Sequence, residues 1–115
     1  MADSLFSYGT LRQPEVQVAL FGRQVPTVED ALAGYRLEWV TVVDPGVVAT
    51  SGSARHPILR RGAVGDPVAG VRLELLAADL ARADEYEVDD YVRVRVTLVS
   101  GLGAWVYVAA ADPAG

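Results

Sequence analysis

The chain of 115 residues contains neither cysteine nor lysine, and each absence removes a class of chemistry. Without cysteine the protein has no thiol nucleophile, no disulfide framework and no cysteine metal site. All ten basic residues are arginine, so a lysine Schiff base and a lysine general base are excluded. The only histidine is His56, and one histidine without cysteine does not supply the ligands of a zinc site. We therefore expect no zinc site.

Long apolar runs and a surplus of positive charge are also missing. No window of about 18 apolar residues occurs, so we expect no membrane span. The first four residues do not combine a basic region with an apolar run, so we expect no signal peptide and a cytoplasmic protein. The formal net charge is −5, which argues against a nucleic-acid partner, although Arg55, Arg60 and Arg61 lie close together in the sequence.

The length and the 51% hydrophobic composition predict one folded domain that spans residues 1–115. Two helices are predicted, Pro14–Phe21 with Gly22 as its C-cap, and Ala77–Tyr86 with Leu76, Leu80 and Ala83 on its buried side. Alternating or apolar-rich segments predict strands at Leu5–Phe6, Thr27–Leu32, Tyr35–Val43, Val68–Leu75, Tyr91–Val99 and Ala104–Ala110, of which the last two form an antiparallel hairpin. The region Val47–Pro67 is predicted to be a long irregular connection. These elements favour an α+β fold, a small and mostly antiparallel β-barrel with short peripheral helices.

The first candidate for a functional segment is Tyr8-Gly9-Thr10-Leu11. It follows the predicted strand Leu5–Phe6 and precedes the helix that we expect to begin at Pro14. A tight turn that leads into a helix leaves backbone N–H groups unpaired near the positive end of the helix dipole. Such groups favour a bound anion, so we expect this loop to form the floor of a site.

A cluster of carboxylates is the second candidate. Asp84, Glu85 and Glu87 end the second predicted helix, and Asp89 and Asp90 follow. Carboxylates close together raise one another's pKa, and burial raises it further, which makes a glutamate a competent general base near neutral pH. The alternative is a solvated acidic helix end. Because Glu87 stands where the helix must give way to the next strand, we expect it to point into a cleft, and Glu85, Asp89 and Asp90 to be solvated.

Serine and histidine offer a different chemistry. A Ser–His–acid arrangement of His56 with Ser7, Ser51 or Ser53 lacks the Gly-x-Ser-x-Gly elbow, so we expect His56 to be an ordinary loop residue. The glycines within residues 62–70 match neither the dinucleotide-binding pattern nor a Walker motif, so no nucleotide site is predicted.

Three widely separated motifs resemble those of one known family. Tyr8-Gly9-Thr10-Leu11, Asp84-Glu85-Tyr86-Glu87 and Tyr91-Val92-Arg93, in this order, resemble the γ-glutamylcyclotransferase-like family, also called AIG2-like proteins. Shorter matches are Gly34-Tyr35-Arg36-Leu37, Pro57-Ile58-Leu59 and Val68-Ala69-Gly70-Val71, so the resemblance extends from about Leu5 to Val108. The chain differs from the usual family residues at Ala83, at Val88 and at His56, where relatives often place an aromatic residue before the proline.

The resemblance implies the same small β-barrel and a set of roles. It implies that Tyr8-Gly9-Thr10-Leu11 binds substrate, that Glu87 is the catalytic acid/base, and that Tyr91 and Arg93 are supporting residues, with Tyr91 at the substrate. The implied reaction converts a γ-glutamyl amine or γ-glutamyl peptide to 5-oxoproline and a free amine by intramolecular cyclisation, without a metal or cofactor. The alternative is a non-catalytic module that binds a small carboxylate or a partner on the same fold. We expect a monomer or a homodimer, with no nucleic-acid or membrane partner.

Overall fold

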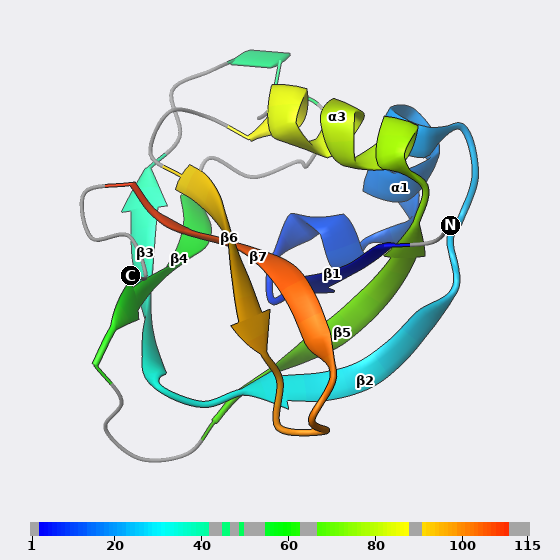
Figure 1. Ribbon diagram of the computed structural model, residues 1–115. Helices are drawn as coiled ribbons and strands as arrows, with labels where there is room; N and C mark the ends of the chain where they lie inside the picture. Colours follow the sequence, from blue (N-terminus) through cyan, green and yellow to red (C-terminus); the bar gives the residue numbers. More distant parts are fainter. Residues whose placement is uncertain are drawn as a thin grey trace.

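The computed structural model describes residues 3–41, 45–46, 49, 55–62, 67–87 and 91–110. Within these ranges the elements follow one another as β1 (Asp3–Ser7), the 3-10 helix η1 (Thr10–Arg12), α1 (Pro14–Phe21), β2 (Thr27–Leu32), β3 (Tyr35–Thr41), β4 (Arg55–Arg61), β5 (Val68–Leu75), α3 (Ala77–Tyr86), β6 (Tyr91–Thr97) and β7 (Gly103–Ala109). This arrangement confirms the α+β class (Figure 1). Val42 and Val43, which we expected to continue a strand, lie outside the described residues, as do Ser51, Ser53, Asp89 and Asp90.

Within the described residues, the strands form two separate sheets rather than a barrel. Five strands pair in the order β2-β5-β1-β7-β6, and β3 pairs with β4 alone. All pairings are antiparallel except that of β1 with β7, so the sheet is mostly antiparallel as predicted. The predicted barrel is wrong, because the sheet does not close. At Gly34, whose φ is 90°, the chain leaves β2 and enters β3, which pairs only with β4 within the described residues. Figure 1 shows this β3–β4 ribbon beside the open sheet, with α1 and α3 together at another side.

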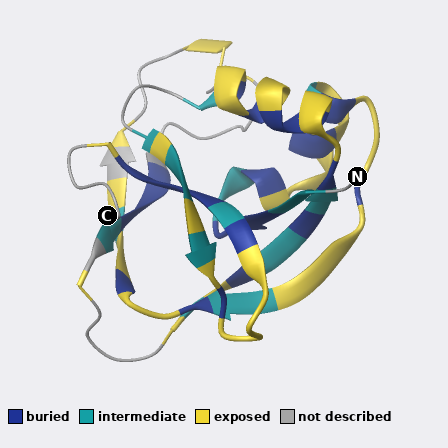
Figure 2. Ribbon diagram, in the orientation of Figure 1, coloured by how far each residue is buried: buried dark blue, intermediate teal, exposed yellow. Residues whose placement is uncertain are grey.

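The central strand β1 is buried on both faces. Successive side chains of a strand point to opposite sides, and Leu5 and Phe6, both almost fully buried, belong to two different apolar clusters. The first cluster lies between the sheet and the helices and contains Leu5, Leu11, Val16, Phe21, Val25, Leu73, Leu75, Leu80, Ala83, Tyr86 and Tyr107. The second lies between the sheet and the ribbon and contains Phe6, Tyr8, Leu32, Tyr35, Leu59, Leu98, Ala104, Val106 and Val108. The loop that leaves β1 therefore begins between two packed cores, which fixes its position (Figure 2).

Both helices have the predicted bounds. Pro14 is the first residue of α1, and Gly22 closes it in the left-handed conformation with φ of 75°, donating its N–H to Val18 O at 2.9 Å. The predicted buried side of α3 is right for Leu80 and Ala83 but wrong for Leu76, which is 53% exposed. Leu76 is the N-cap, so its side chain lies outside the helical turn. No helix in the described part of the chain is long and apolar enough to cross a membrane.

The predicted irregular connection contains a strand. Arg55–Arg61 is β4, which pairs with β3 along its whole length. The alternation that marks most strands is missing because His56, Pro57, Ile58 and Leu59 are all buried, so both faces are covered.

Candidate functional site

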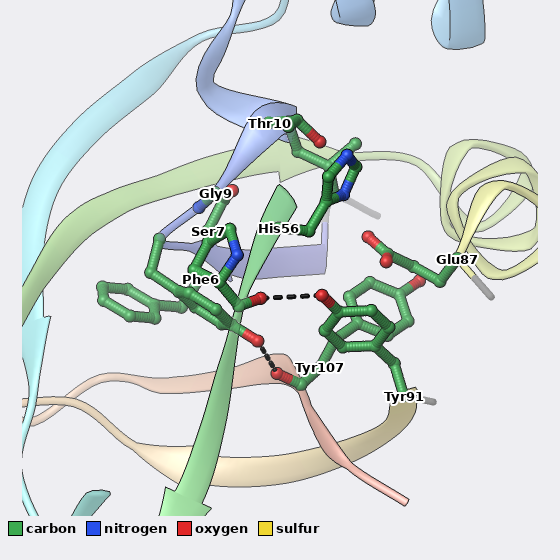
Figure 3. Close-up of a pocket in the computed structure, with 11 residues that line it drawn as sticks. Phe6, Ser7, Gly9, Thr10, His56, Glu87, Tyr91 and Tyr107 are labelled. Carbon is green, nitrogen blue, oxygen red and sulfur yellow. Dashed lines mark hydrogen bonds between the residues drawn. The ribbon is translucent and has the colours of Figure 1, made fainter. Parts of the chain in front are cut away.

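One pocket brings together every residue of the predicted site (Figure 3). It is lined by Phe6, Ser7, Tyr8, Gly9, Thr10, Leu11, His56, Pro57, Glu87, Tyr91 and Tyr107. The loop after β1 forms one wall, and the end of α3 carries Glu87 on another. Ser7, His56 and Tyr107 are additions that the site prediction did not include.

The loop turns back on itself before α1 begins. The predicted order of strand, turn and helix is right, and the turn contains the short 3-10 helix η1. Arg12 N donates to Gly9 O at 3.2 Å, and Gln13 N donates to Thr10 O at 2.9 Å. A side chain at position 9 would place its Cβ 3.1 Å from Pro57 Cγ, so glycine lets the loop lie against β4. The first N–H groups of η1 have no partners within this short helix, as at any helix start.

Two tyrosines brace the pocket through their hydroxyl groups. The buried Tyr8 donates its hydroxyl to the carbonyl oxygen of Tyr107, and Tyr91 donates its hydroxyl to Pro57 O at 2.7 Å. Burial raises the pKa of Tyr8 well above its usual value, with smaller contributions from Tyr91 and Glu87. The Tyr8 hydroxyl therefore remains protonated near neutral pH, and the two hydrogen bonds connect strands that are far apart in the sequence. Leu11 is buried in the first apolar cluster and contributes apolar wall.

Glu87 occupies the C-cap position of α3. Its backbone N–H donates to Ala83 O at 3.0 Å, and its extended conformation (φ −71°, ψ 137°) ends the helix. Figure 3 shows its carboxyl group pointing into the pocket toward the side that carries His56 and Thr10. No hydrogen bond to this carboxyl group is found within the described residues. Its burial raises its pKa.

The environment of Glu87 makes it a base near neutral pH. Burial, together with a smaller contribution from the negative charge of Asp84, raises the pKa of Glu87 from 4.5 to about 8. The predicted solvation of Glu85 is confirmed, since this residue is exposed. The acidic helix end therefore contains one carboxyl group that faces a pocket and one that faces water.

Asp84 is held behind Glu87 by residues from β6 and β7. Its carboxylate accepts hydrogen bonds from Arg93 Nε at 2.9 Å, Arg93 Nη2 at 3.0 Å and the Tyr107 hydroxyl at 2.7 Å. The Arg93 guanidinium also lies 4.4 Å from the centre of the Trp105 ring. Arg93 is thus a supporting residue that fixes Asp84, and Asp84 is a site residue that sequence reasoning did not assign.

His56 differs from its prediction. It is not a loop residue but part of β4, it is 4% exposed, and it lines the same pocket as Glu87. Ser7 also lines this pocket, and its Oγ accepts the Gly9 N–H at 3.4 Å. The sequence signal that could have assigned His56 to the site is its position directly before Pro57, where relatives often have an aromatic residue. No cluster of three or more His, Cys, Asp and Glu side chains within the described residues has the arrangement of a metal site.

Comparison with known proteins identifies the class to which this fold and pocket belong. The model of the γ-glutamyl cyclotransferase, AIG2-like family matches residues 5–115, and the chain belongs to this family. A comparison with functionally curated proteins gives no significant match.

Several solved structures share the fold. Two Arabidopsis thaliana proteins with solution structures match with TM-scores of 0.76 and 0.74 at 22% and 19% identity, over 99% and 98% of this chain and 66% and 72% of theirs. A γ-glutamyl cyclotransferase matches with a TM-score of 0.68 at 15% identity, over 95% of this chain and 67% of that protein. The chain thus spans about two thirds of the length of the first of these structures, and identities this low show a shared fold alone.

Proposed function

We propose that the protein is a γ-glutamylcyclotransferase that converts a γ-glutamyl amine or γ-glutamyl peptide to 5-oxoproline and a free amine. The observation that carries this proposal is the position of Glu87, whose carboxyl group faces the Tyr8–Leu11 loop across the pocket and has a pKa of about 8. A general base is most effective when its pKa lies near the working pH. Membership of the γ-glutamyl cyclotransferase, AIG2-like family supports the same reaction class.

Glu87 handles the protons in this reaction. Its carboxylate takes a proton from the α-ammonium group of the substrate, and the freed α-amine attacks the γ-carbonyl carbon. A carbon–nitrogen bond forms to close the five-membered lactam, and the bond from the γ-carbon to the leaving nitrogen breaks. The α-nitrogen loses two protons and the leaving nitrogen gains two, with Glu87 as the carrier, so water is not consumed. Nucleophile and electrophile are in one molecule, so the pocket must chiefly hold a folded substrate conformer.

The Tyr8–Leu11 loop binds the polar end of the substrate. Backbone N–H groups at the start of η1 donate to the α-carboxylate or to the oxyanion that develops on the γ-carbonyl oxygen. Tyr8, Tyr91 and Pro57 provide the wall against which the folded substrate lies. No metal or cofactor takes part in these steps.

Replacing the proposed base tests this function. Glu87→Gln keeps the shape of the side chain but cannot take up a proton, so 5-oxoproline release from a γ-glutamyl substrate should fall on the order of 10²–10⁴-fold. The matched control is Glu85→Gln, an exposed carboxylate two residues earlier, which should retain wild-type turnover. Full release of 5-oxoproline by Glu87→Gln contradicts the assignment. If the wild type binds small carboxylates but releases no 5-oxoproline from any γ-glutamyl compound, the protein is a binding module instead.

A further inference from the structure

An open groove adjoins the pocket at the loop after β1. Tyr8, Gly9, Thr10 and Pro57 line both the groove and the pocket. The remaining lining residues are Arg12, Gln13 and Pro14 from η1 and the start of α1, together with Leu37 and Trp39 from β3. A molecule that is held in the pocket can therefore extend into the groove without leaving the protein surface.

The register of the β3–β4 ribbon directs two apolar side chains to this groove. Trp39 is paired with Pro57, and Leu37 is paired with Leu59. Residues directly opposite each other in an antiparallel pair present their side chains on the same face. Leu59 is buried in the second apolar cluster and Pro57 lines both the pocket and the groove, so Leu37 and Trp39 share their face with residues of the core and of the site.

The two β3 residues on this face, Leu37 and Trp39, are exposed to solvent. Leu37 is 43% exposed and Trp39 is 55% exposed. The intervening positions Arg36 and Glu38 lie on the other face and are joined by an ion pair of 2.7 Å. On β3 the two apolar side chains and the two charged side chains therefore lie on opposite faces, and the apolar ones border the open groove beside the pocket. Apolar surface next to a pocket with a few polar groups is typical of a ligand-binding site.

Arg12 gives this groove a positive charge. It is the charged member of the groove lining, and its Nε donates to Gly9 O at 3.1 Å, which ties the side chain to the loop. The exposed guanidinium has further N–H groups beyond Nε, and arginine binds carboxylates strongly.

We propose that the groove binds the leaving group of the substrate and selects a γ-glutamyl dipeptide whose second residue has a large apolar or aromatic side chain. This inference rests on the proposed cyclotransferase reaction. The γ-carbonyl lies between Glu87 and the loop, the apolar side chain packs against Leu37 and Trp39, and the terminal carboxylate pairs with Arg12. When the bond from the γ-carbon to the peptide nitrogen breaks, that amino acid departs through the groove.

Three compounds separate these contributions in the full-length protein. γ-Glutamyl-phenylalanine carries both features, γ-glutamyl-alanine lacks the large side chain, and γ-glutamyl-phenethylamine lacks the carboxylate. We expect the wild type to turn over the first with kcat/KM about 10-fold or more above the other two. Trp39→Ala should remove the preference for phenylalanine over alanine, and Arg12→Met should remove the preference for the carboxylate. Leu102→Ala, at an apolar residue of similar exposure in the β6–β7 turn, should leave both preferences unchanged.

Each other result overturns a defined part of the inference. Equal kcat/KM for all three compounds in the wild type, or preferences that survive in both variants, overturn the groove assignment but leave the cyclotransferase reaction intact. If Arg12→Met lowers turnover of all three compounds equally, Arg12 acts through its hydrogen bond to Gly9 O, and the proposed contact with the substrate carboxylate is overturned. If the wild type is a dimer that dissociates in Trp39→Ala while the substrate preferences stay unchanged, the groove is a contact between two copies of the chain. Release of 5-oxoproline from none of the compounds overturns the groove assignment and the proposed function together.

Discussion

Thr10 Oγ1 lies 3.0 Å from the hydroxyl oxygen of Tyr86, 76 positions later in the chain. Thr10 begins η1 in the pocket loop, and Tyr86 is the last residue of α3, directly before Glu87. The contact therefore joins the loop that we propose to bind substrate to the helix end that carries the proposed base. Tyr86 is itself buried in the first apolar cluster, so the contact is anchored in the core.

Removing this contact should impair turnover through geometry. Thr10→Val and Tyr86→Phe each delete one hydroxyl, and a hydrogen bond of this kind contributes about 0.5–1.5 kcal/mol. We expect each variant to lower kcat/KM by up to about 10-fold, and the double variant to lose no more than the worse single variant, because both delete the same contact. Steady-state kinetics of the four proteins measure the coupling. Losses that simply add would mean that the two hydroxyls act independently.

Glu87 should make the protein less stable as the pH rises. Its pKa is 4.5 in the unfolded chain and about 8 in the folded protein, so between these values the folded state retains a proton that the unfolded state has lost. The stabilisation is complete below pH 4.5 and is lost as the pH rises to about 8. Because one pKa unit corresponds to about 1.4 kcal/mol, the loss is on the order of a few kcal/mol. Urea unfolding of wild type and Glu87→Gln across this range should show the variant gaining relative stability at the alkaline end, and a constant difference contradicts the burial of the carboxyl group.

Asp84 should raise the pH at which Glu87 becomes a base. Its negative charge raises the pKa of Glu87, so Asp84→Asn should lower that pKa. In the wild type, the Arg93 guanidinium donates to the Asp84 carboxylate. In Asp84→Asn its positive charge would be left uncompensated beside the site, and it would lower the pKa of Glu87 as well. We expect the acidic limb of the pH profile of kcat/KM to move to lower pH, whereas Glu85→Gln leaves it in place. Added salt should reduce the difference between wild type and Asp84→Asn, since Asp84 is accessible to solvent. An unmoved limb would show that burial alone sets the pKa of Glu87.

The elements that the sequence predicted well are those with local signals. Pro14 and Gly22 mark both ends of α1 through their own backbone conformations, and the alternation of Val68–Leu75 reproduces β5 residue for residue. The site residues were predicted because their motifs resemble a family, and the pocket brings these distant motifs together. Backbone preferences and short motifs act within a few residues, so they remain readable without knowledge of the fold.

The features that the sequence did not predict depend on distant partners. Strand β4 was missed because its burial on both faces comes from packing against β7 and the pocket, which removes the alternating pattern. Barrel closure was wrong because pairing between edge strands is a property of the assembled sheet. The function of Asp84 was missed because its partners, Arg93 and Tyr107, stand 9 and 23 positions later and meet it only in the folded protein.

Replacing Gly70 should destabilise the protein, because there is no space for a side chain at this position. It lies in β5 within the Val68-Ala69-Gly70-Val71 match, where a Cβ would stand 2.3 Å from Ser7 O and 2.8 Å from Phe6 Cζ. The backbone at the end of β1 and a core aromatic ring occupy this space, and neither can move freely. We expect Gly70→Ala to lower the free energy of unfolding by about 1–3 kcal/mol, and to reduce kcat/KM because displacement of Ser7 shifts the loop. Ala69→Ser, at the exposed neighbouring position, should change stability by less than about 0.5 kcal/mol. Chemical denaturation of both variants measures the difference, and a Gly70→Ala protein as stable as Ala69→Ser would mean that β1 and β5 are not so closely packed at the start of the loop.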